Sequence, residues 1–266
     1  MKININYRSN DYWVLTEWAK SLIDAFKRSK KLSNKGTIVN IYIPYSLMPN
    51  KSKKDEINIA IFTHNNQDGL FERFARISDF SFCQAPMWEK EIRNLGKNNV
   101  DTLPVPPDPY FSCKLNLAWI GHFAVPSRKG LDLFKKVEDL SFVNLIYNDH
   151  TFNQKIPKEE PKQIQNYYDM ADYILITSSI EGGPMCLVEG LKTGKKVICP
   201  LNVGNAELYE EGIISYKKSN WESLKEVLIK LYNQKKKIAD IVKDLTWDNY
   251  ADNLINIICK EFNIEP

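Results

Sequence analysis

The sequence lacks the long apolar runs that membrane-spanning proteins need. No window approaches about 18 uncharged apolar residues, and the N-terminus has no apolar segment of the kind that signal peptides carry. We therefore expect neither a membrane span nor a secretory leader. The sequence predicts a cytoplasmic protein, with peripheral attachment to the inner face of the membrane as an alternative.

Several signatures of cofactor and metal chemistry are also missing. The five cysteines form no CxxC pair, which argues against zinc ribbons and thioredoxin-like redox motifs. No G-x-G-x-x-G and no P-loop motif occurs. Lys and Arg number 36 against 33 Asp and Glu, and a net charge of +3 excludes a strongly basic nucleic-acid packaging protein.

Strand-like and helix-like segments alternate along the chain, which predicts α/β architecture with parallel sheets. The predicted strands are residues 2–7, 37–44, 57–63, 80–84, 115–121, 142–147, 173–177 and 196–199. The predicted helices are residues 14–31, 86–95, 130–137, 164–170, 184–193, 221–233 and 248–262. We see no internal repeat in this pattern.

A proline-rich segment divides the pattern in two. Residues 102–112 read TLPVPPDPYFS, and their prolines exclude them from a helix interior. We interpret this segment as a linker between an N-terminal domain of residues 1–108 and a C-terminal domain of residues 109–266, which a final helix closes. Two such units predict a ligand-binding cleft at the carboxyl ends of their strands.

Residues 178–200, which read SSIEGGPMCLVEGLKTGKKVICP, carry the strongest functional signal. A predicted strand runs into a turn that holds Gly182 and Gly183, and a helix then begins at Pro184. The free backbone N–H groups of Gly182–Met185 would lie at the helix N-terminus, where paired glycines let an anion approach closely. The pattern therefore predicts a phosphate-binding site.

Two carboxylates bracket this predicted anion site. Glu181 precedes the helix, whereas Glu189 lies on it, five residues beyond Pro184. Five residues correspond to about 7.5 Å along a helix axis. This spacing suits a ligand that has a central diphosphate and a hydroxylated ring at each end.

Residues 171–199 resemble the retaining group 1 glycosyltransferases, a family with an E-x7-E motif and the GT-B fold. Glu181 and Glu189 match the two glutamates of that motif, and the residues on either side follow the family pattern. Three departures from the pattern, at Gly190, Thr193 and Lys196, leave both glutamates in place.

Further segments carry the same resemblance. Residues 121–130 read GHFAVPSRKG and align Gly121 and Lys129 with the family's phosphate-binding segment. His122 replaces the family's usual arginine there, and Arg128 is a candidate to compensate for it. The proline-rich linker and the final helix also look like those of the family, so the resemblance covers roughly residues 55–260.

The resemblance implies the GT-B fold, in which two Rossmann-like parallel-sheet domains face a cleft and the C-terminal one binds a nucleoside-diphosphate-sugar donor. It implies that Glu189 holds the ribose hydroxyls and that Glu181 contacts the sugar ring. Arg128, Lys129 and the backbone N–H groups of the turn would hold the diphosphate. Transfer with retention of configuration is also implied, with no metal and no cofactor, because the nucleotide-sugar is a co-substrate.

The N-terminal domain is short for this family, and its first strand is followed by no glycine-rich loop. His64, at the end of the predicted third strand, matches a family histidine that faces the donor sugar. We take His64 and Glu181 as catalytic candidates, with a structural histidine as the alternative. The abbreviated domain and His122 leave a second hypothesis open, namely a non-catalytic module that binds a nucleotide-sugar or a glycan.

Residues 27–54 contain eight basic residues and no acidic one. This run either complements a helix C-terminus and a solvated loop, or it forms a face for an anionic partner. Such a partner would be a membrane surface with a lipid-linked acceptor, or DNA. The predicted acceptor is accordingly a glycan, a lipid-linked glycan or, as in phage-type DNA glycosyltransferases, a modified DNA base.

Overall fold

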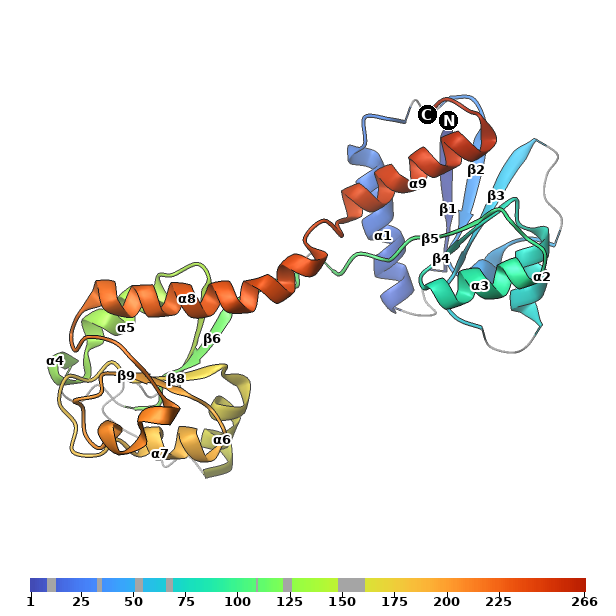
Figure 1. Cartoon of the computed structure of the whole chain (residues 1–266). Coiled ribbons are helices and arrows are strands. Elements are labelled where there is room, and N and C mark those ends of the chain that lie inside the picture. Colours follow the sequence, from blue (N-terminus) through green and yellow to red (C-terminus); the bar gives the residue numbers. More distant parts are fainter. Residues whose placement is uncertain are drawn as a thin grey trace. The chain divides into compact units, whose positions relative to one another are not determined.

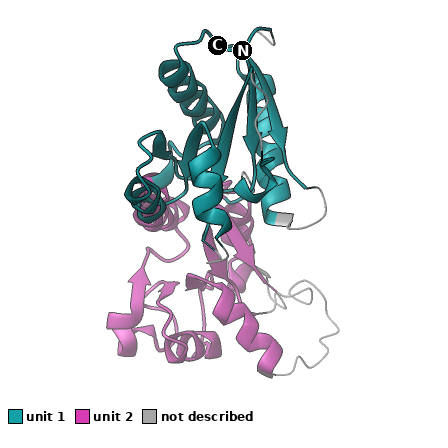
Figure 2. Cartoon of the chain, turned by 90° about the vertical axis from the view of Figure 1, so that its right-hand side faces the viewer, with its two compact units in different colours: residues 1–111, 242–266 teal, residues 112–241 magenta. Residues whose placement is uncertain are grey.

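The computed structural model describes residues 1–8, 13–32, 35–50, 55–65, 69–108, 110–121, 126–147 and 161–266. It divides into two compact units (Figure 2), of which unit 1 combines Met1–Phe111 with Val242–Pro266 and unit 2 is Ser112–Ile241. Each unit contains a sheet of five strands, and every neighbouring pair of strands is parallel. The prediction of two Rossmann-like α/β units is therefore confirmed, while the cleft between them stays a prediction.

The strands of unit 1, which are labelled in Figure 1, have the order β1-β2-β3-β4-β5. Its strands are β1 (Lys2–Asn6), β2 (Ile38–Tyr42), β3 (Glu56–Phe62), β4 (Phe80–Cys83) and β5 (Val100–Thr102). Its helical elements are α1 (Trp13–Arg28), η1 (Tyr45–Leu47), α2 (Leu70–Ile77), α3 (Pro86–Asn94) and α9 (Trp247–Phe262). One face of the sheet packs against α1 and α9, and the other packs against η1, α2 and α3.

The last helix, α9, belongs to unit 1, although the sequence pattern assigns it to the C-terminal domain of residues 109–266. Trp247 of α9 meets Trp18 of α1 edge-on, with ring centroids 6.3 Å apart, and the buried Leu254 joins the same core. Both chain termini lie side by side in this unit (Figures 1 and 2). The structure thus corrects the predicted domains, because residues 242–266 return to the first sheet.

The described part of the basic run at residues 27–54 is largely engaged in ion pairs. One pair lies within α1, and two join the end of α1 and the residues after it to α9. The pairs are Lys27–Asp24 at 2.9 Å, Arg28–Asp248 at 2.6 Å and Lys31–Asp252 at 3.0 Å. Lys51, Lys53 and Lys54 lie outside the described residues. These ion pairs reduce the positive charge that the run offers to a partner, and an anionic partner stays a prediction.

Unit 2 has the strand order β10-β9-β8-β6-β7. Its strands are β6 (Leu115–Ala118), β7 (Val143–Ile146), β8 (Tyr173–Leu175), β9 (Val197–Cys199) and β10 (Ile213–Ser215). Its helical elements are α4 (Pro126–Lys129), α5 (Leu131–Glu138), α6 (Pro161–Met170), α7 (Met185–Lys192), η2 (Ala206–Gly212) and α8 (Trp221–Ala239), and η3 (Asp240–Val242) follows where the chain returns to unit 1. Helices α5 and α8 cover one face of the sheet, whereas α6 and α7 cover the other.

The strand order of unit 2 reverses direction at β6. From β6 the chain moves to β7 on one side and later returns to β8 on the other side. In parallel sheets such a reversal leaves a crevice at the carboxyl ends of the two strands, and ligands bind there. The segments that follow β6 and β8 contain Gly121 and Glu181, so two predicted site residues flank the reversal point.

The two units share a hydrogen-bonding device, contrary to the expectation that the chain has no internal repeat. In each unit an aspartate just before a central strand holds an asparagine of the neighbouring strand through two bonds. The Asp79 N–H donates to Asn58 O at 2.9 Å, and Asp79 Oδ2 accepts from the Asn58 N–H at 2.7 Å. Asp172 and Asn116 form the same two bonds in unit 2, both at 2.8 Å.

The helices that follow these strands, α3 and α7, repeat a second set of features. Each begins at one residue of a Pro-Met pair, carries a glutamate five residues beyond the proline, and ends near a glycine with positive φ. A lysine comes next, and its Nζ donates to the carbonyl just before the aspartate of the first device. These residues are Pro86, Glu91, Gly96 and Lys97 in unit 1 and Pro184, Glu189, Gly194 and Lys195 in unit 2. Strands β3, β4 and β5 thus correspond to β6, β8 and β9.

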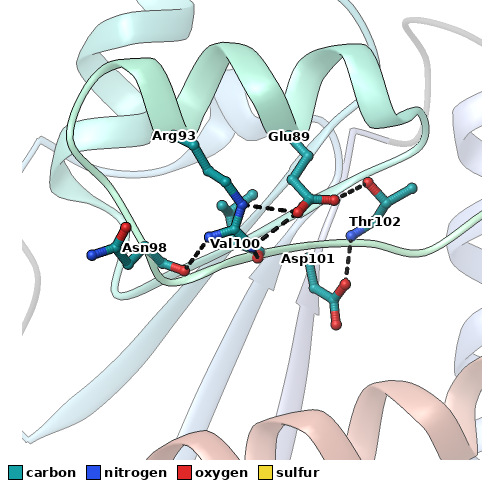
Figure 3. Close-up of polar contacts among 6 residues, drawn as sticks. All are labelled: Glu89, Arg93, Asn98, Val100, Asp101 and Thr102. Atoms are coloured by element: carbon teal, nitrogen blue, oxygen red, sulfur yellow. Dashed lines mark hydrogen bonds and ion pairs between the residues drawn. The ribbon is translucent and has the colours of Figure 1, made fainter.

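A polar network holds β5, a strand that the sequence pattern does not predict, against α3 (Figure 3). Arg93 donates to Glu89 Oε1 at 2.9 Å and to the carbonyls of Asn98 and Val100 at 3.2 and 2.8 Å. Glu89 Oε2 accepts from Thr102 Oγ1 at 2.6 Å, and this bond is the main reason that the pKa of Glu89 is lowered. The network therefore anchors the chain where the proline-rich linker begins.

None of the helices that the structure describes combines the length and the apolar character that a membrane span requires.

Candidate functional site

The segment after β8 carries the centre of the predicted site. The chain is buried as far as Ser178, and Glu181 Oε1 accepts a hydrogen bond from Ser178 Oγ at 2.8 Å. The same oxygen forms an ion pair with Lys129. The side chains of Lys129 and Glu181 are only 20% and 12% exposed, so solvent screens their attraction less than it screens a surface pair.

The surroundings of Glu181 keep its carboxylate ionised. Burial acts to raise the pKa of Glu181, but hydrogen bonds from Lys129 and Ser178 and the charges of Lys129 and Arg128 outweigh it. The pKa of Glu181 therefore lies below its ordinary value. An ionised carboxylate accepts hydrogen bonds only, so Glu181 is suited to bind hydroxyl or amide groups that donate hydrogen bonds.

Lys129 reaches Glu181 because the turn between α4 and α5 packs on the end of β8. Thr177 Oγ1 donates to the Lys129 carbonyl at 2.7 Å and accepts from Trp119 Nε1 at 3.0 Å. The next residue, Gly130, has a φ of 69°, and a Cβ there would overlap the Thr177 carbonyl. Only glycine fits this close approach, which fixes the backbone of Lys129 beside β8.

Helix α7 starts at Met185 without a side-chain cap. The sequence pattern places Pro184 at the first helical position, whereas the structure makes it the N-cap, with φ −66° and ψ 121°. Gly182 and Gly183 precede it and are exposed. Uncapped N–H groups at a helix start favour an anion through both hydrogen bonds and the helix dipole.

Asn205 lies against the same turn, after β9. The preceding Gly204 has a φ of 61°, and a Cβ on it would lie 2.7 Å from Pro184 Cδ. Asn205 Oδ1 is buried and has no hydrogen-bond partner among the described residues. An unsatisfied buried acceptor costs about 1–3 kcal/mol, and a hydroxyl group of a ligand at this turn would satisfy it.

Glu189 lies on α7 and is held by a neighbouring helix. Its Oε2 accepts a hydrogen bond from the hydroxyl of Tyr168, on α6, at 2.5 Å. Burial raises the pKa of the Cys186 thiol to about 12. The charges of Lys129, Glu189 and Glu181 also act on this thiol. The thiol is therefore protonated at neutral pH, which argues against a nucleophilic role.

The remaining predicted residues are placed differently. Arg128 is exposed, and its carbonyl accepts from the Ser179 N–H at 2.9 Å, beside the Glu181 turn. Gly121 follows β6 and packs on the ring of Trp119, since a Cβ would lie 2.9 Å from it. His64 lies after β3 in unit 1, is exposed and shares a hydrogen bond with Thr63 at 2.5 Å. Its role at the sugar stays a prediction, and His122 lies outside the described residues.

Sequence reasoning missed two residues that the structure adds to the site. Ser178 belongs to the quoted motif, but its contact with Glu181 depends on how the turn folds back. Tyr168 precedes the motif by ten residues, and a buried tyrosine near the end of a predicted helix gives little functional signal. Among the described residues no three metal-ligating side chains gather, and metal independence stays a prediction.

A family comparison identifies the part of the chain that holds most of this site. Residues 132–245 match the family model described as glycosyl transferases group 1. The matched range contains Tyr168, Ser178, Glu181 and Glu189, while Lys129 lies three residues before it. No curated protein sequence matches the chain.

Solved glycosyltransferase structures are similar to the chain only at low identity. A TarM mutant from S. aureus, in complex with fondaparinux, alpha-GlcNAc-glycerol and UDP, is 13% identical with a TM-score of 0.35, over 91% of this chain and 55% of its own. Sucrose-phosphate synthase from Thermosynechococcus elongatus is 11% identical with a TM-score of 0.40, over 97% of this chain and 81% of its own. WaaG, a glycosyltransferase involved in lipopolysaccharide biosynthesis, is 12% identical with a TM-score of 0.35, over 94% of both chains.

The chain thus spans little more than half the length of the TarM chain. The family match and the two parallel five-stranded sheets agree with the predicted GT-B fold class. The Ser178–Glu181 contact and the Tyr168–Glu189 contact both fall within the matched range. Residues 132–245, which begin in α5, are therefore similar to the glycosyl transferases group 1 family.

Proposed function

We propose that this chain is a glycosyltransferase whose donor, a nucleoside-diphosphate sugar, binds at the carboxyl edge of the unit 2 sheet. The family match over residues 132–245 supports glycosyl transfer in general. The observation that carries the donor site is the shielded Lys129–Glu181 pair beside the uncapped start of α7, next to the point where the strand order reverses.

Each part of such a donor has a chemically suitable partner in unit 2. The diphosphate suits the N–H groups at the start of α7, together with the cationic side chains of Arg128 and Lys129. The sugar hydroxyls suit the ionised carboxylate of Glu181, and the ribose hydroxyls suit Glu189. Asn205 Oδ1 supplies a further acceptor, since it has no hydrogen-bond partner among the described residues.

In the proposed reaction the bond between the anomeric carbon and the diphosphate oxygen breaks, and the diphosphate keeps the electron pair. The oxygen of an acceptor hydroxyl forms the new bond to the anomeric carbon, and its proton passes to the departing diphosphate. Negative charge builds on the leaving oxygen, so fixed cations and N–H dipoles at that place lower the barrier. Retention of configuration by front-face attack, a contribution of His64 and independence from metals belong to the same proposal.

The acceptor in this proposal is a glycan or a lipid-linked glycan, and a modified DNA base is the alternative. The basic run motivates the lipid surface and DNA, but its three ion pairs with aspartates weaken the motivation. Affinity for DNA that falls steeply as salt rises would favour the DNA alternative. Absence of DNA binding at low ionic strength would exclude it.

A thermal-shift panel of UDP-, GDP-, ADP- and CMP-type sugars tests the donor site. A donor at 100 times its Kd stabilises the fold by about 2.7 kcal/mol, and we expect one base type to give this shift. Glu189→Ala should lose it, whereas Glu226→Ala, an exposed glutamate of α8, should keep it. If no donor shifts the wild type, the donor-site proposal is wrong.

The alternative of a non-catalytic binding module predicts a different outcome for donor turnover. Transferases often release some donor sugar to water, whereas a module that only binds does not. Slow hydrolysis of the donor found in the panel would therefore support the enzyme. A donor that binds but stays intact, with every acceptor class tested, would support the module.

A further inference from the structure

The hydrogen bond from Tyr168 to Glu189 is a contact of the donor site that neither the family match nor the resemblance assigns. We propose that Tyr168 is a positioning residue, which fixes the Glu189 carboxylate in the orientation that binds the ribose of the donor. This inference rests on the proposed function, because it assumes that Glu189 contacts the donor.

Tyr168 is a rigid point of attachment. It is 2% exposed and packs in the core that α6 and α7 form with the sheet, beside Ile174 and Leu187. Its ring therefore has little freedom, and its hydroxyl is directed to Glu189 Oε2 at 2.5 Å. Burial and the Glu189 hydrogen bond raise the pKa of Tyr168, so the hydroxyl stays protonated and acts as a donor.

The backbone of Glu189 is equally constrained. The next residue, Gly190, packs so closely on β8 that a Cβ would lie 2.7 Å from Ile174 Cγ1. Helix α7 cannot slide along the sheet without breaking this contact, so the Glu189 side chain is held at both of its ends. A side chain that is already ordered loses less conformational entropy when a ligand binds, and this gain appears as affinity.

The hydrogen bond occupies one oxygen of the Glu189 carboxylate and leaves the other for the ligand. Tyr168 bonds Oε2, and a hydroxyl group of the ligand can donate to the second oxygen, Oε1. A carboxylate in a single orientation matches one arrangement of ribose hydroxyls, whereas a freely rotating one matches many poorly. The contact therefore supports selective binding of the ribose.

The shared frame, meaning the aspartate, glutamate, glycine and lysine positions that recur in both units, does not require a tyrosine at this place. Tyr168 lies four residues before Asp172, and the residue four positions before Asp79 in unit 1 is Ala75. The corresponding glutamate of unit 1, Glu91, is held instead by Asn65 Nδ2 at 2.7 Å. The tyrosine thus belongs to the unit that carries the donor site, and the common fold does not explain it.

A double-mutant cycle on the full chain tests the inference, with UDP, GDP, ADP and CMP as probes and calorimetry as the readout. We expect Tyr168→Phe to weaken the binding of the recognised nucleotide about three- to tenfold, and Glu189→Ala to weaken it at least as much. If Tyr168 acts through Glu189, Tyr168→Phe should add nothing in the Glu189→Ala background.

Tyr216→Phe is the matched control. Tyr216 is another buried tyrosine of unit 2, 5% exposed, and its hydroxyl donates to the Ile176 carbonyl at 2.8 Å. Its loss should lower thermal stability as the loss of the Tyr168 hydroxyl does, yet leave nucleotide affinity unchanged. Equal losses of affinity in both variants would show a merely structural role and overturn the inference.

The remaining outcomes separate this inference from the proposed function. Wild-type affinity in Glu189→Ala would overturn the donor-site proposal itself. Weak binding in Glu189→Ala, with wild-type affinity in Tyr168→Phe or with additive losses in the double variant, would overturn the inference alone. Should Tyr168→Phe not fold, Glu189→Asp replaces it, because the shorter side chain withdraws the carboxylate from Tyr168. Wild-type affinity in Glu189→Asp would then overturn the inference.

Discussion

The junction between β8 and α7 and its counterpart between β4 and α3 lie in the same frame but differ in length. Seven positions separate Asp79 from Pro86 in unit 1, whereas twelve separate Asp172 from Pro184 in unit 2. In unit 1 the strand passes to the helix through two residues, Gln84 and Ala85. In unit 2 the five additional positions make room for the turn that carries Glu181.

This difference separates what holds the fold from what forms the site. The contacts that both units share lie at the strand starts and at the helix ends, away from the longer junction. The partners of Glu181, by contrast, belong to unit 2 alone, and they come from the longer junction and from the α4–α5 turn. We therefore expect that residues of the site can be removed while unit 2 still folds.

Deletion of residues 179–183 tests this separation most severely. It makes the β8–α7 junction as long as the β4–α3 junction and leaves the bonds of Asp172 and Lys195 untouched. We expect a cooperative thermal unfolding transition and no stabilisation by any nucleotide-sugar, a loss of about 2.7 kcal/mol at 100 times the wild-type Kd. A variant that still binds the donor would show that the turn is not the site.

Glu181→Ala removes one side chain from the same turn. Because the half-buried Lys129 loses its partner and the sugar loses an ionised acceptor, we expect turnover to fall about 100- to 1,000-fold, as for loss of one preorganised electrostatic group. Glu226→Ala on α8 is the control and should keep wild-type turnover. Initial rates at saturating donor measure both, and unchanged turnover in Glu181→Ala would remove Glu181 from the catalytic candidates.

Local patterns predict much of this comparison. The spacing of Glu181 and Glu189 and the pair of glycines before Pro184 are features of neighbouring residues, so sequence reasoning finds the turn and the helix that follows it. The contact of Lys129 with Glu181 joins residues 52 positions apart, and that of Tyr168 with Glu189 joins residues 21 positions apart. Such contacts depend on the strand order, which the sequence pattern does not fix.

The same limit explains the errors in the fold. Helix α9 has a clear apolar face, but that face does not reveal whether α1 or the second sheet covers it. Strands β5 and β10 have three residues each and contain polar residues, whereas the equally short β8 and β9 are predicted because they are apolar throughout. The repeated frame is not visible as a sequence repeat, because its matching residues are single positions separated by segments of different length.

The aspartate devices allow a direct comparison of the two frames. Asp172→Ala leaves the buried end of β6 without an acceptor for the Asn116 N–H and also removes the partner of Lys235, 2.5 Å away. Asp79→Ala has only the first effect, on Asn58. We expect both to lower the free energy of unfolding by about 1–3 kcal/mol, with the larger loss for Asp172→Ala. Urea denaturation measures the difference, and equal losses would mean that Lys235 contributes nothing.

The smallest expected effect is on how the free energy of unfolding depends on pH under acidic conditions. The pKa of Glu181 is lowered in the folded state although burial opposes it, and the pKa of Glu89 is lowered chiefly by the Thr102 hydrogen bond. A lowered folded-state pKa gives stability that is present above the unfolded value, about 4.3, and is lost as the pH falls through the folded value. Glu181→Gln and Glu89→Gln should therefore each flatten the decline of unfolding free energy below about pH 5, one in each unit. Denaturation curves at successive pH values measure the slopes, and an unchanged slope in either variant would show that the carboxylate concerned is not stabilised by its neighbours.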